Sequence, residues 1–323
     1  MDHVRLGASG LRVSRICLGA MSFGVPERGH TPWSLNAEYS RPLLRRALDA
    51  GITFFDTANV YSDGTSEEIV GRALRDFVRR DDVVLATKVG GRTRPGPYGA
   101  RLSRTAIFAE IDNSLRRLGV DHVDLYQIHR WDPVTPIEET LEALNDVVKA
   151  GKARYLGASS MHAWQFTKAL HLADANGWTR FVAMQNLYNL LYREEEREML
   201  PLCREYGIGV LPYSPLARGR LTRPWAHRTR RLDHDEYART MYSDDDRPVV
   251  DAVGKVAAQR GRSRAQVALA WIASRPGVTA PIVGVTSEQH LDEAVAAVQL
   301  KLTQDEIEQL EALYVPHRLI GFS

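Results

Sequence analysis

Three apolar segments of the chain each lead into an ionisable side chain. Residues 52–55 are followed by Asp56, residues 83–87 by Lys88, and residues 123–128 by His129, and Tyr61 follows Asp56 by five positions. Taken one at a time, these residues have ordinary interpretations: a helix cap, a lysine with a buried stem, a hydrogen-bonded core histidine and a loop aromatic. If the segments are neighbouring parallel strands, however, their carboxyl ends converge on one rim of a barrel. We therefore predict that the four side chains lie together.

A phenol, an ammonium, an imidazole and a carboxylate suit the protonation of a carbonyl oxygen that becomes negative as a nucleophile adds to its carbon. The ordinary pKa of tyrosine is about 10, and an adjacent Lys88 is expected to lower the pKa of Tyr61. Asp56 is the predicted partner of the buried Lys88, and His129 is predicted to orient the substrate oxygen. The chain has no G-x-S-x-G motif for a serine nucleophile. A hydride cofactor is therefore the predicted source of the nucleophile.

Strand and helix patterns alternate along most of the chain and predict how these residues are positioned. A turn near residues 8–10 predicts a hairpin before the first barrel strand. Eight strand and helix repeats with nearly continuous apolar strands predict a parallel sheet buried on both faces, and closing it gives an α/β fold, the (β/α)8 TIM barrel. Strands are expected at 15–18, 53–55, 83–87, 123–128, 153–158, 181–184, 208–211 and 279–283, and helices at 36–50, 66–79, 104–118, 137–150, 163–176 and 193–205.

The chain is expected to form a single domain over residues 1–323, with the hairpin capping the bottom of the barrel and extra helices at 287–298 and 304–313. Residues 218–246 have little periodicity and fall after the seventh strand, so we expect an inserted loop over the cofactor face. The tail, residues 314–323, is expected to fold back across the barrel mouth. An open doubly wound sheet is the structural alternative, but its dinucleotide-binding form requires G-x-G-x-x-G after a strand, which this sequence lacks.

Composition excludes several classes of protein. Lys plus Arg number 42 against 40 Asp plus Glu, and the net charge of +2 gives no field that favours nucleic acid. No apolar run approaches the roughly 20 residues of a membrane span, and the first ten residues lack the apolar centre of a signal peptide. The two cysteines, Cys17 and Cys203, lack metal-ligand spacing and are interpreted as core residues. We expect a cytoplasmic protein that binds neither nucleic acid nor membrane; the sequence does not define its oligomeric state.

Eight motifs occur in the chain in the order LGAMSFG, FFDTANVYSDGTSEE, ATKVGG, DLYQIHRWD, LGASSM, MQNLYN, PYSPLARG and PIVGVTSEQHLDEA. They span nearly the whole chain and resemble those of the aldo-keto reductases, in particular a bacterial NADP(H)-dependent and aryl-alcohol dehydrogenase-like branch. The resemblance implies a barrel that binds a nicotinamide cofactor in extended form without a Rossmann fold. It also implies a catalytic tetrad with Tyr61 as general acid, made up of Asp56, Tyr61, Lys88 and His129.

The same resemblance implies where the cofactor lies. Ser159 and Gln185 would bind the nicotinamide carboxamide and Tyr213 would stack on its ring, a role that also suits an aromatic side chain at a strand end. The remaining implied cofactor residues, from the nicotinamide to the adenosine end, are Met21, Asp56, Ser214, Leu216, Arg218, Gly284, Thr286, His290 and Glu293.

The chain departs from the family pattern at three places. Ser160 and Ala294 stand where many members have Asn, and the last motif lacks the Arg or Lys that grips the 2′-phosphate of NADP. Thr286 and His290 are weaker substitutes for it, and Arg218 or Arg220 of the inserted loop could reach the phosphate. NADP(H) is the favoured cofactor over NAD(H).

Three functions fit these residues to different degrees. The first is an oxidoreductase that reduces an aldehyde or ketone, with an apolar pocket for aromatic or bulky substrates formed by Met21, Trp33, Tyr98, Trp131, Leu319 and Phe322. The second is a redox-sensing or accessory subunit that binds the nucleotide with little turnover. The third is a barrel hydrolase, but His129 and Asp56 lack the neighbouring ligands that would complete a metal site, so no metal is expected.

Overall fold

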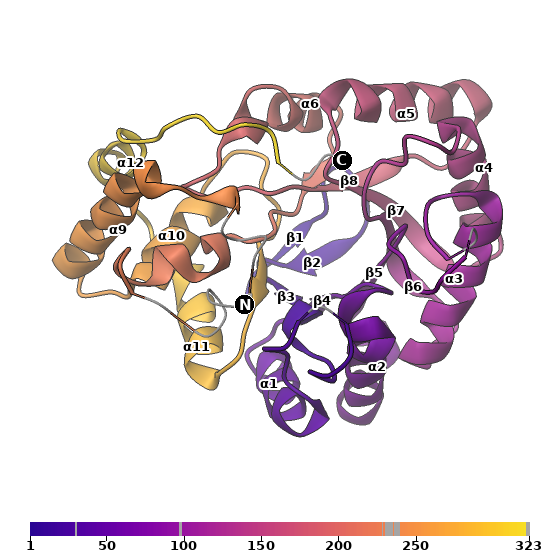
Figure 1. Ribbon diagram of the computed structural model, residues 1–323, viewed down its shortest axis with the longest axis horizontal. Coiled ribbons are helices and arrows are strands. Elements are labelled where there is room, and N and C mark those ends of the chain that lie inside the picture. Colours follow the sequence, from indigo (N-terminus) through magenta and orange to yellow (C-terminus); the bar gives the residue numbers. More distant parts are fainter. Residues whose placement is uncertain (30, 97–98, 228, 230–234, 236–239, 321–323) are drawn as a thin grey trace.

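Eight parallel strands form one sheet in the computed structural model, which describes residues 1–29, 31–96, 99–227, 229, 235 and 240–320 (Figure 1). Seven strands pair in chain order, and the eighth, β10, pairs with β3 at the beginning of the series. The strands are β3 (Cys17–Gly19), β4 (Phe54–Asp56), β5 (Val84–Val89), β6 (Val123–Ile128), β7 (Ala153–Ser159), β8 (Phe181–Gln185), β9 (Gly209–Val210) and β10 (Ile282–Gly284).

Backbone hydrogen bonds close this sheet into a barrel. The amide of Thr279 donates to the carbonyl oxygen of Val210 at 2.9 Å, and the amide of Ile282 donates to that of Pro212 at 2.8 Å. These bonds join the end of β9 to the segment that leads into β10, so neither strand is an open edge. The predicted (β/α)8 barrel is confirmed.

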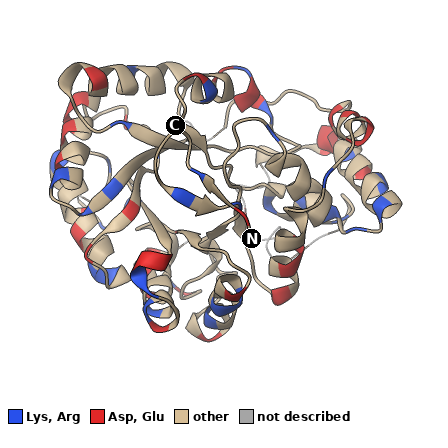
Figure 2. Ribbon diagram, turned by 180° about the vertical axis from the view of Figure 1, so that it is seen from behind, with Lys and Arg blue, Asp and Glu red and all other residues tan. Residues whose placement is uncertain are grey.

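The helices lie around the outside of the barrel, and Figure 2 shows most charged residues on them and few on the strands. They are α1 (Ala37–Asp49), α2 (Thr65–Phe77), α3 (Arg104–Leu118), α4 (Ile137–Lys149), α5 (Ala163–Asn176), α6 (Met199–Glu205), α9 (Arg247–Arg260), α10 (Arg264–Ala273), α11 (Glu288–Ala297) and α12 (Gln304–Glu311). None of the helices in the described residues is long and apolar enough to cross a bilayer.

The hairpin of β1 (His3–Arg5) and β2 (Arg12–Ser14) closes the end of the barrel where the strands begin. Its Leu6 and Val13 are fully buried in an apolar cluster inside the barrel, together with Cys17 and Phe54 from the first residues of two strands. The hairpin therefore fills the bottom of the barrel, as predicted, and leaves the opposite rim open for a site.

The predicted helix 193–205 is wrong in its first half. A short 3-10 turn, Glu194–Glu196, precedes α6, and Glu198 has non-helical backbone angles between them. Pro201 is compatible with the first turn of a new helix but not with the middle of a longer one. Contacts with the carboxyl-terminal tail stabilise the turn. Glu194 accepts hydrogen bonds from the Tyr314 hydroxyl at 2.6 Å and the His317 amide at 2.8 Å. The tail up to Ile320 thus lies along this segment.

Candidate active site

The structure brings the predicted tetrad together at the carboxyl-terminal rim of the barrel. Asp56 is the last residue of β4, Lys88 lies near the end of β5, and His129 directly follows β6. The Lys88 ammonium forms an ion pair with Asp56 and donates hydrogen bonds to the Thr57 carbonyl oxygen at 2.8 Å and the Tyr61 hydroxyl at 3.2 Å. The rings of Tyr61 and His129 meet edge to face, with their centroids 5.8 Å apart.

A strained turn positions Tyr61. Ser62, Asp63 and Gly64, the three residues that follow it, all have positive φ, and the first two have side chains that disfavour this conformation. The Ser62 hydroxyl is held by Thr31 at 3.0 Å and Ser34 at 3.1 Å, and these contacts offset the strain. Because α2 begins immediately after the turn, the phenol is fixed relative to both the helix and the barrel.

Sequence reasoning missed Gln127, which supports the carboxylate. Its amide nitrogen donates to Asp56 Oδ1 at 2.9 Å, and Gln185 donates to the same oxygen at 3.1 Å. Gln127 lies two positions before His129 in β6 and is fully buried. A glutamine in the middle of an apolar strand was the available signal, since a buried amide needs polar partners.

Burial and neighbouring groups together set the pKa of three side chains in this cluster. Burial acts to lower the pKa of Lys88, but the neighbouring Asp56 and Tyr61 outweigh it, and the pKa is raised. Burial raises the pKa of Tyr61, and Lys88 only partly opposes this, so the expected net lowering is wrong for the cofactor-free protein. Burial, with the charges of Arg130 and Lys88, holds the pKa of His129 well below its ordinary value. At neutral pH the site therefore contains a charged lysine, a protonated phenol and a neutral imidazole.

A groove of about 770 Å³ runs from this cluster along the rim. Most of the residues implied for cofactor binding line it, namely Met21, Asp56, Gln185, Tyr213, Ser214, Leu216, Arg218, Gly284, Thr286, His290 and Glu293. Ser159 does not line it. Ser159 is buried, and its hydroxyl lies 3.3 Å from the Ser160 hydroxyl, which in turn donates to the Tyr213 hydroxyl at 3.3 Å.

The arginines of the inserted loop differ in position. Arg218 lines the groove, but its guanidinium forms an ion pair with the buried Asp235 at 2.5 Å. Arg220 lies outside the groove, and its guanidinium stacks over Trp225 at 4.3 Å. Arg223, which sequence reasoning missed, lines the groove, and burial lowers its pKa. Its guanidinium makes one hydrogen bond within the described residues, to the Thr222 hydroxyl at 3.1 Å.

Only part of the predicted apolar pocket is found beside Tyr61. Met21 and Trp33 line the groove. Trp131 instead packs against Trp164 with ring centroids 6.2 Å apart, and Leu319 is 51% exposed on the tail. The other two predicted pocket residues, Tyr98 and Phe322, lie outside the described residues.

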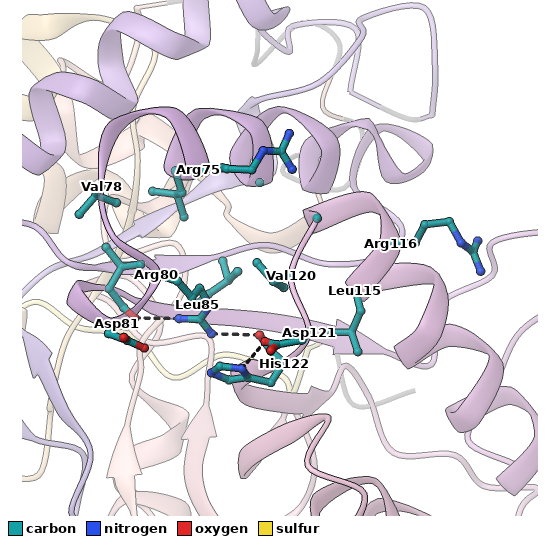
Figure 3. A pocket seen from close by; sticks show the side chains of 14 residues that line it. Arg75, Val78, Arg80, Asp81, Leu85, Leu115, Arg116, Val120, Asp121 and His122 are labelled. Atoms are coloured by element: carbon teal, nitrogen blue, oxygen red, sulfur yellow. Dashed lines mark hydrogen bonds and ion pairs between the residues drawn. The ribbon is translucent and has the colours of Figure 1, made fainter.

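A second hollow lies at the opposite end of the barrel, between the carboxyl-terminal ends of α2 and α3 (Figure 3). It measures about 820 Å³ and contains none of the tetrad. Its ionisable side chains are partly engaged, since His122 pairs with Asp121 at 2.6 Å and Arg80 pairs with Asp124 at 2.7 Å. Catalytic residues of such barrels lie at the other end of the strands, so this hollow is not the active site.

Comparison with known proteins identifies the family of this chain. The sequence profile of the Aldo/keto reductase family matches residues 15–315. The chain therefore belongs to the aldo-keto reductase family. It is an oxidoreductase, and members of this family use a nicotinamide cofactor to act on small carbonyl compounds.

Relatives match the chain over nearly its full length. It is 46% identical to a versiconal hemiacetal acetate reductase of Aspergillus parasiticus, with 98% of each chain covered. It is 42% identical to an aldo-keto reductase of Fusarium vanettenii, covering 100% of this chain and 94% of the relative. It is 40% identical to a putative aryl-alcohol dehydrogenase of Schizosaccharomyces pombe, covering 98% of this chain and 96% of the relative. The aryl-alcohol dehydrogenase resemblance is thus confirmed, but these relatives are fungal and not bacterial.

Proposed function

We propose that the protein is an NADP(H)-dependent reductase of aldehydes or ketones in which Tyr61 donates the proton. The observation that carries this proposal is the Tyr61 hydroxyl, which lies 3.2 Å from the buried Lys88 ammonium at one end of the groove. A phenol that is protonated at neutral pH and touches a fixed cation is a proton donor whose conjugate base is already stabilised.

Each side chain of the site has a separate role in the proposed reaction. When bound, the reduced nicotinamide supplies a hydride to the carbonyl carbon. The neutral His129 donates a hydrogen bond that orients the carbonyl oxygen, and Tyr61 transfers its proton to that oxygen as negative charge develops there. Lys88 then stabilises the phenolate. Asp56 keeps Lys88 charged and in place, and Gln127 holds Asp56 through its 2.9 Å hydrogen bond.

The groove has the chemistry that a dinucleotide requires. Tyr213 offers a flat surface beside the tetrad, and Gln185 offers an amide for the carboxamide. At the other end lie the first turn of α11, which is capped by Ser287, and the imidazole of His290. A helix amino terminus favours a phosphate. Six described residues of the inserted loop also line the groove, and we assign them the role of covering the cofactor: Arg218, Gly219, Thr222, Arg223, His227 and Thr229.

Arg223 is the residue that we assign to the 2′-phosphate of NADP. It forms no ion pair within the described part of the chain, and it lies near enough to His290 that its charge opposes protonation of that imidazole. An unpaired and partly buried guanidinium is costly unless a ligand neutralises it. Arg218, already paired with Asp235, is less available.

Replacing Arg223 by Gln is expected to raise the Kd for NADPH by about 10- to 100-fold, because a charged hydrogen bond to phosphate contributes about 1.5–3 kcal/mol. The Kd for NADH is expected to change by less than about threefold. Fluorescence quenching during cofactor titration measures both values. Arg220→Gln, a matched change outside the groove, should alter neither Kd. An equal rise in the Kd for NADPH and for NADH in Arg223→Gln would contradict the assignment.

The pH profile tests the proposed ionisation states. Because the pKa of His129 is lowered and that of Tyr61 is raised, both groups keep their active forms from about pH 6.5 to 9. We expect kcat/KM for reduction to be flat across this range and to fall only as the pH rises through the pKa of Tyr61. A change in kcat/KM centred near pH 7 to 8 would contradict these states.

Loss of absorbance of the reduced nicotinamide, measured with a panel of substituted benzaldehydes and ketones, tests the function itself. Turnover of several carbonyl compounds is the expected result. Tight cofactor binding without turnover would instead favour the second candidate, the redox-sensing or accessory subunit. The relatives do not favour that candidate, because they are named as reductases and dehydrogenases.

A further inference from the structure

Arg130 lies in the catalytic groove, next to His129 in the chain. One of its terminal nitrogens, Nη1, donates to the carbonyl oxygen of His129 at 2.6 Å and to the Ser159 hydroxyl at 3.4 Å. The centre of the guanidinium is 5.8 Å from the centroid of the Tyr213 ring. These contacts hold the cation close to both His129 of the tetrad and the Tyr213 ring.

Arg130 has no carboxylate partner within the described residues, in contrast to the partly buried Arg193 and Arg218. Arg193 pairs with Glu311 at 2.9 Å, and Arg218 pairs with Asp235 at 2.5 Å. Asp56, the acid of the tetrad, is already engaged by Lys88, Gln127 and Gln185. The charge of Arg130 therefore acts on the groove itself.

The free donors of Arg130 have a definite geometry. Both of its hydrogen bonds use Nη1, so the edge formed by Nε and Nη2 makes none within the described residues. Neither nitrogen is among the buried polar atoms that lack a partner. Two parallel N–H donors on one edge of a guanidinium match the two oxygens of a carboxylate.

We propose that Arg130 selects carbonyl substrates that carry a carboxylate near the reacting carbonyl group, which it binds through the Nε and Nη2 edge. This inference rests on the proposed reductase function. His129 and Tyr61 then contact the carbonyl oxygen while Arg130 holds the acid group. Met21 and Trp33 line the same groove and suit the hydrocarbon between the two polar groups.

Matched substrates distinguish the effect of substrate charge on kcat/KM from the effect of substrate shape. The 2-, 3- and 4-carboxybenzaldehydes are each compared with their methyl esters, which keep the aldehyde and the ring but lose the negative charge. For at least one isomer, we expect kcat/KM of the acid to exceed that of the ester by about tenfold or more. Arg130→Gln should lower this acid-to-ester ratio by about 10- to 100-fold, the range of one charged hydrogen-bonded pair. Arg130→Lys should keep part of the ratio.

Two further measurements exclude other roles. Arg154→Gln, an exposed arginine on β7, is the control and should leave the ratio unchanged. The Kd of benzoate for the cofactor-loaded enzyme, which requires no turnover, should rise about tenfold or more in Arg130→Gln at an unchanged Kd for NADPH.

Each outcome decides one point. Reduction of acids and esters with equal kcat/KM would overturn the carboxylate preference and leave the reductase function standing. If Arg130→Gln lowers kcat/KM equally for acids and esters, or weakens the affinity for NADPH, the carboxylate preference would be overturned. Arg130 would then have a role in positioning His129 or the cofactor. Benzoate binding that depends on Arg130 without reduction of any carbonyl would support the anion site and refute the reductase.

Discussion

Replacing Tyr61 by Phe is expected to lower kcat for carbonyl reduction by about a thousandfold or more while the Kd for the cofactor changes by less than about threefold. The phenylalanine keeps the ring that packs edge to face on His129 and removes only the hydroxyl that contacts Lys88. A positioned general acid contributes about 10²- to 10⁴-fold to rate, and here the same hydroxyl also directs the cation to the reacting oxygen.

Stopped-flow measurement of a single turnover separates the chemical step from cofactor binding, which fluorescence quenching measures independently. Tyr206→Phe is the matched control, because that tyrosine is 43% exposed and does not line the groove. The control should retain full activity, and both variants should unfold at similar temperatures. A Tyr61→Phe protein with more than about a tenth of the normal kcat would remove Tyr61 from the role of acid.

Replacing Lys88 by Met is expected to abolish reduction and to lower the free energy of unfolding by about 3–5 kcal/mol at pH 8, the usual cost of leaving one charge of a buried pair alone. Lys88 is fully buried and Asp56 is nearly so, hence water cannot replace the lost ammonium. Gln127 and Gln185 still donate to Asp56, but neutral amides compensate a carboxylate less well than an ammonium does.

A double variant distinguishes the loss of charge balance from the loss of packing. Asp56→Asn with Lys88→Met removes both charges, and it should recover most of the stability without recovering activity.

Urea denaturation at pH 8 measures these free energies. A double variant no more stable than Lys88→Met would show that the packing of the lysine stem, not its charge, accounts for the loss. Measurable reduction by either variant would show that the phenolate needs no neighbouring cation.

The sequence alone determined the fold and the composition of the tetrad. Alternating strand and helix patterns predict a parallel barrel, and the position of Asp56, Lys88 and His129 at the ends of three successive strands predicts that they meet. Both predictions depend only on periodicity and on the order of the elements, which a linear sequence contains. The hairpin at the bottom of the barrel was predictable for the same reason, since a turn between two short apolar segments is a local signal.

The tertiary structure decided what depends on distance and burial. Whether burial or Lys88 controls the pKa of Tyr61 is a balance that residue order does not contain, and the sequence predicted the wrong sign. Arg218, Arg220 and Arg223 are nearly equivalent in the sequence, yet only Arg223 lines the groove without a carboxylate partner in the described residues. Gln127 acts on Asp56 across 71 positions of the chain, and only closure of the barrel brings that amide to the carboxylate.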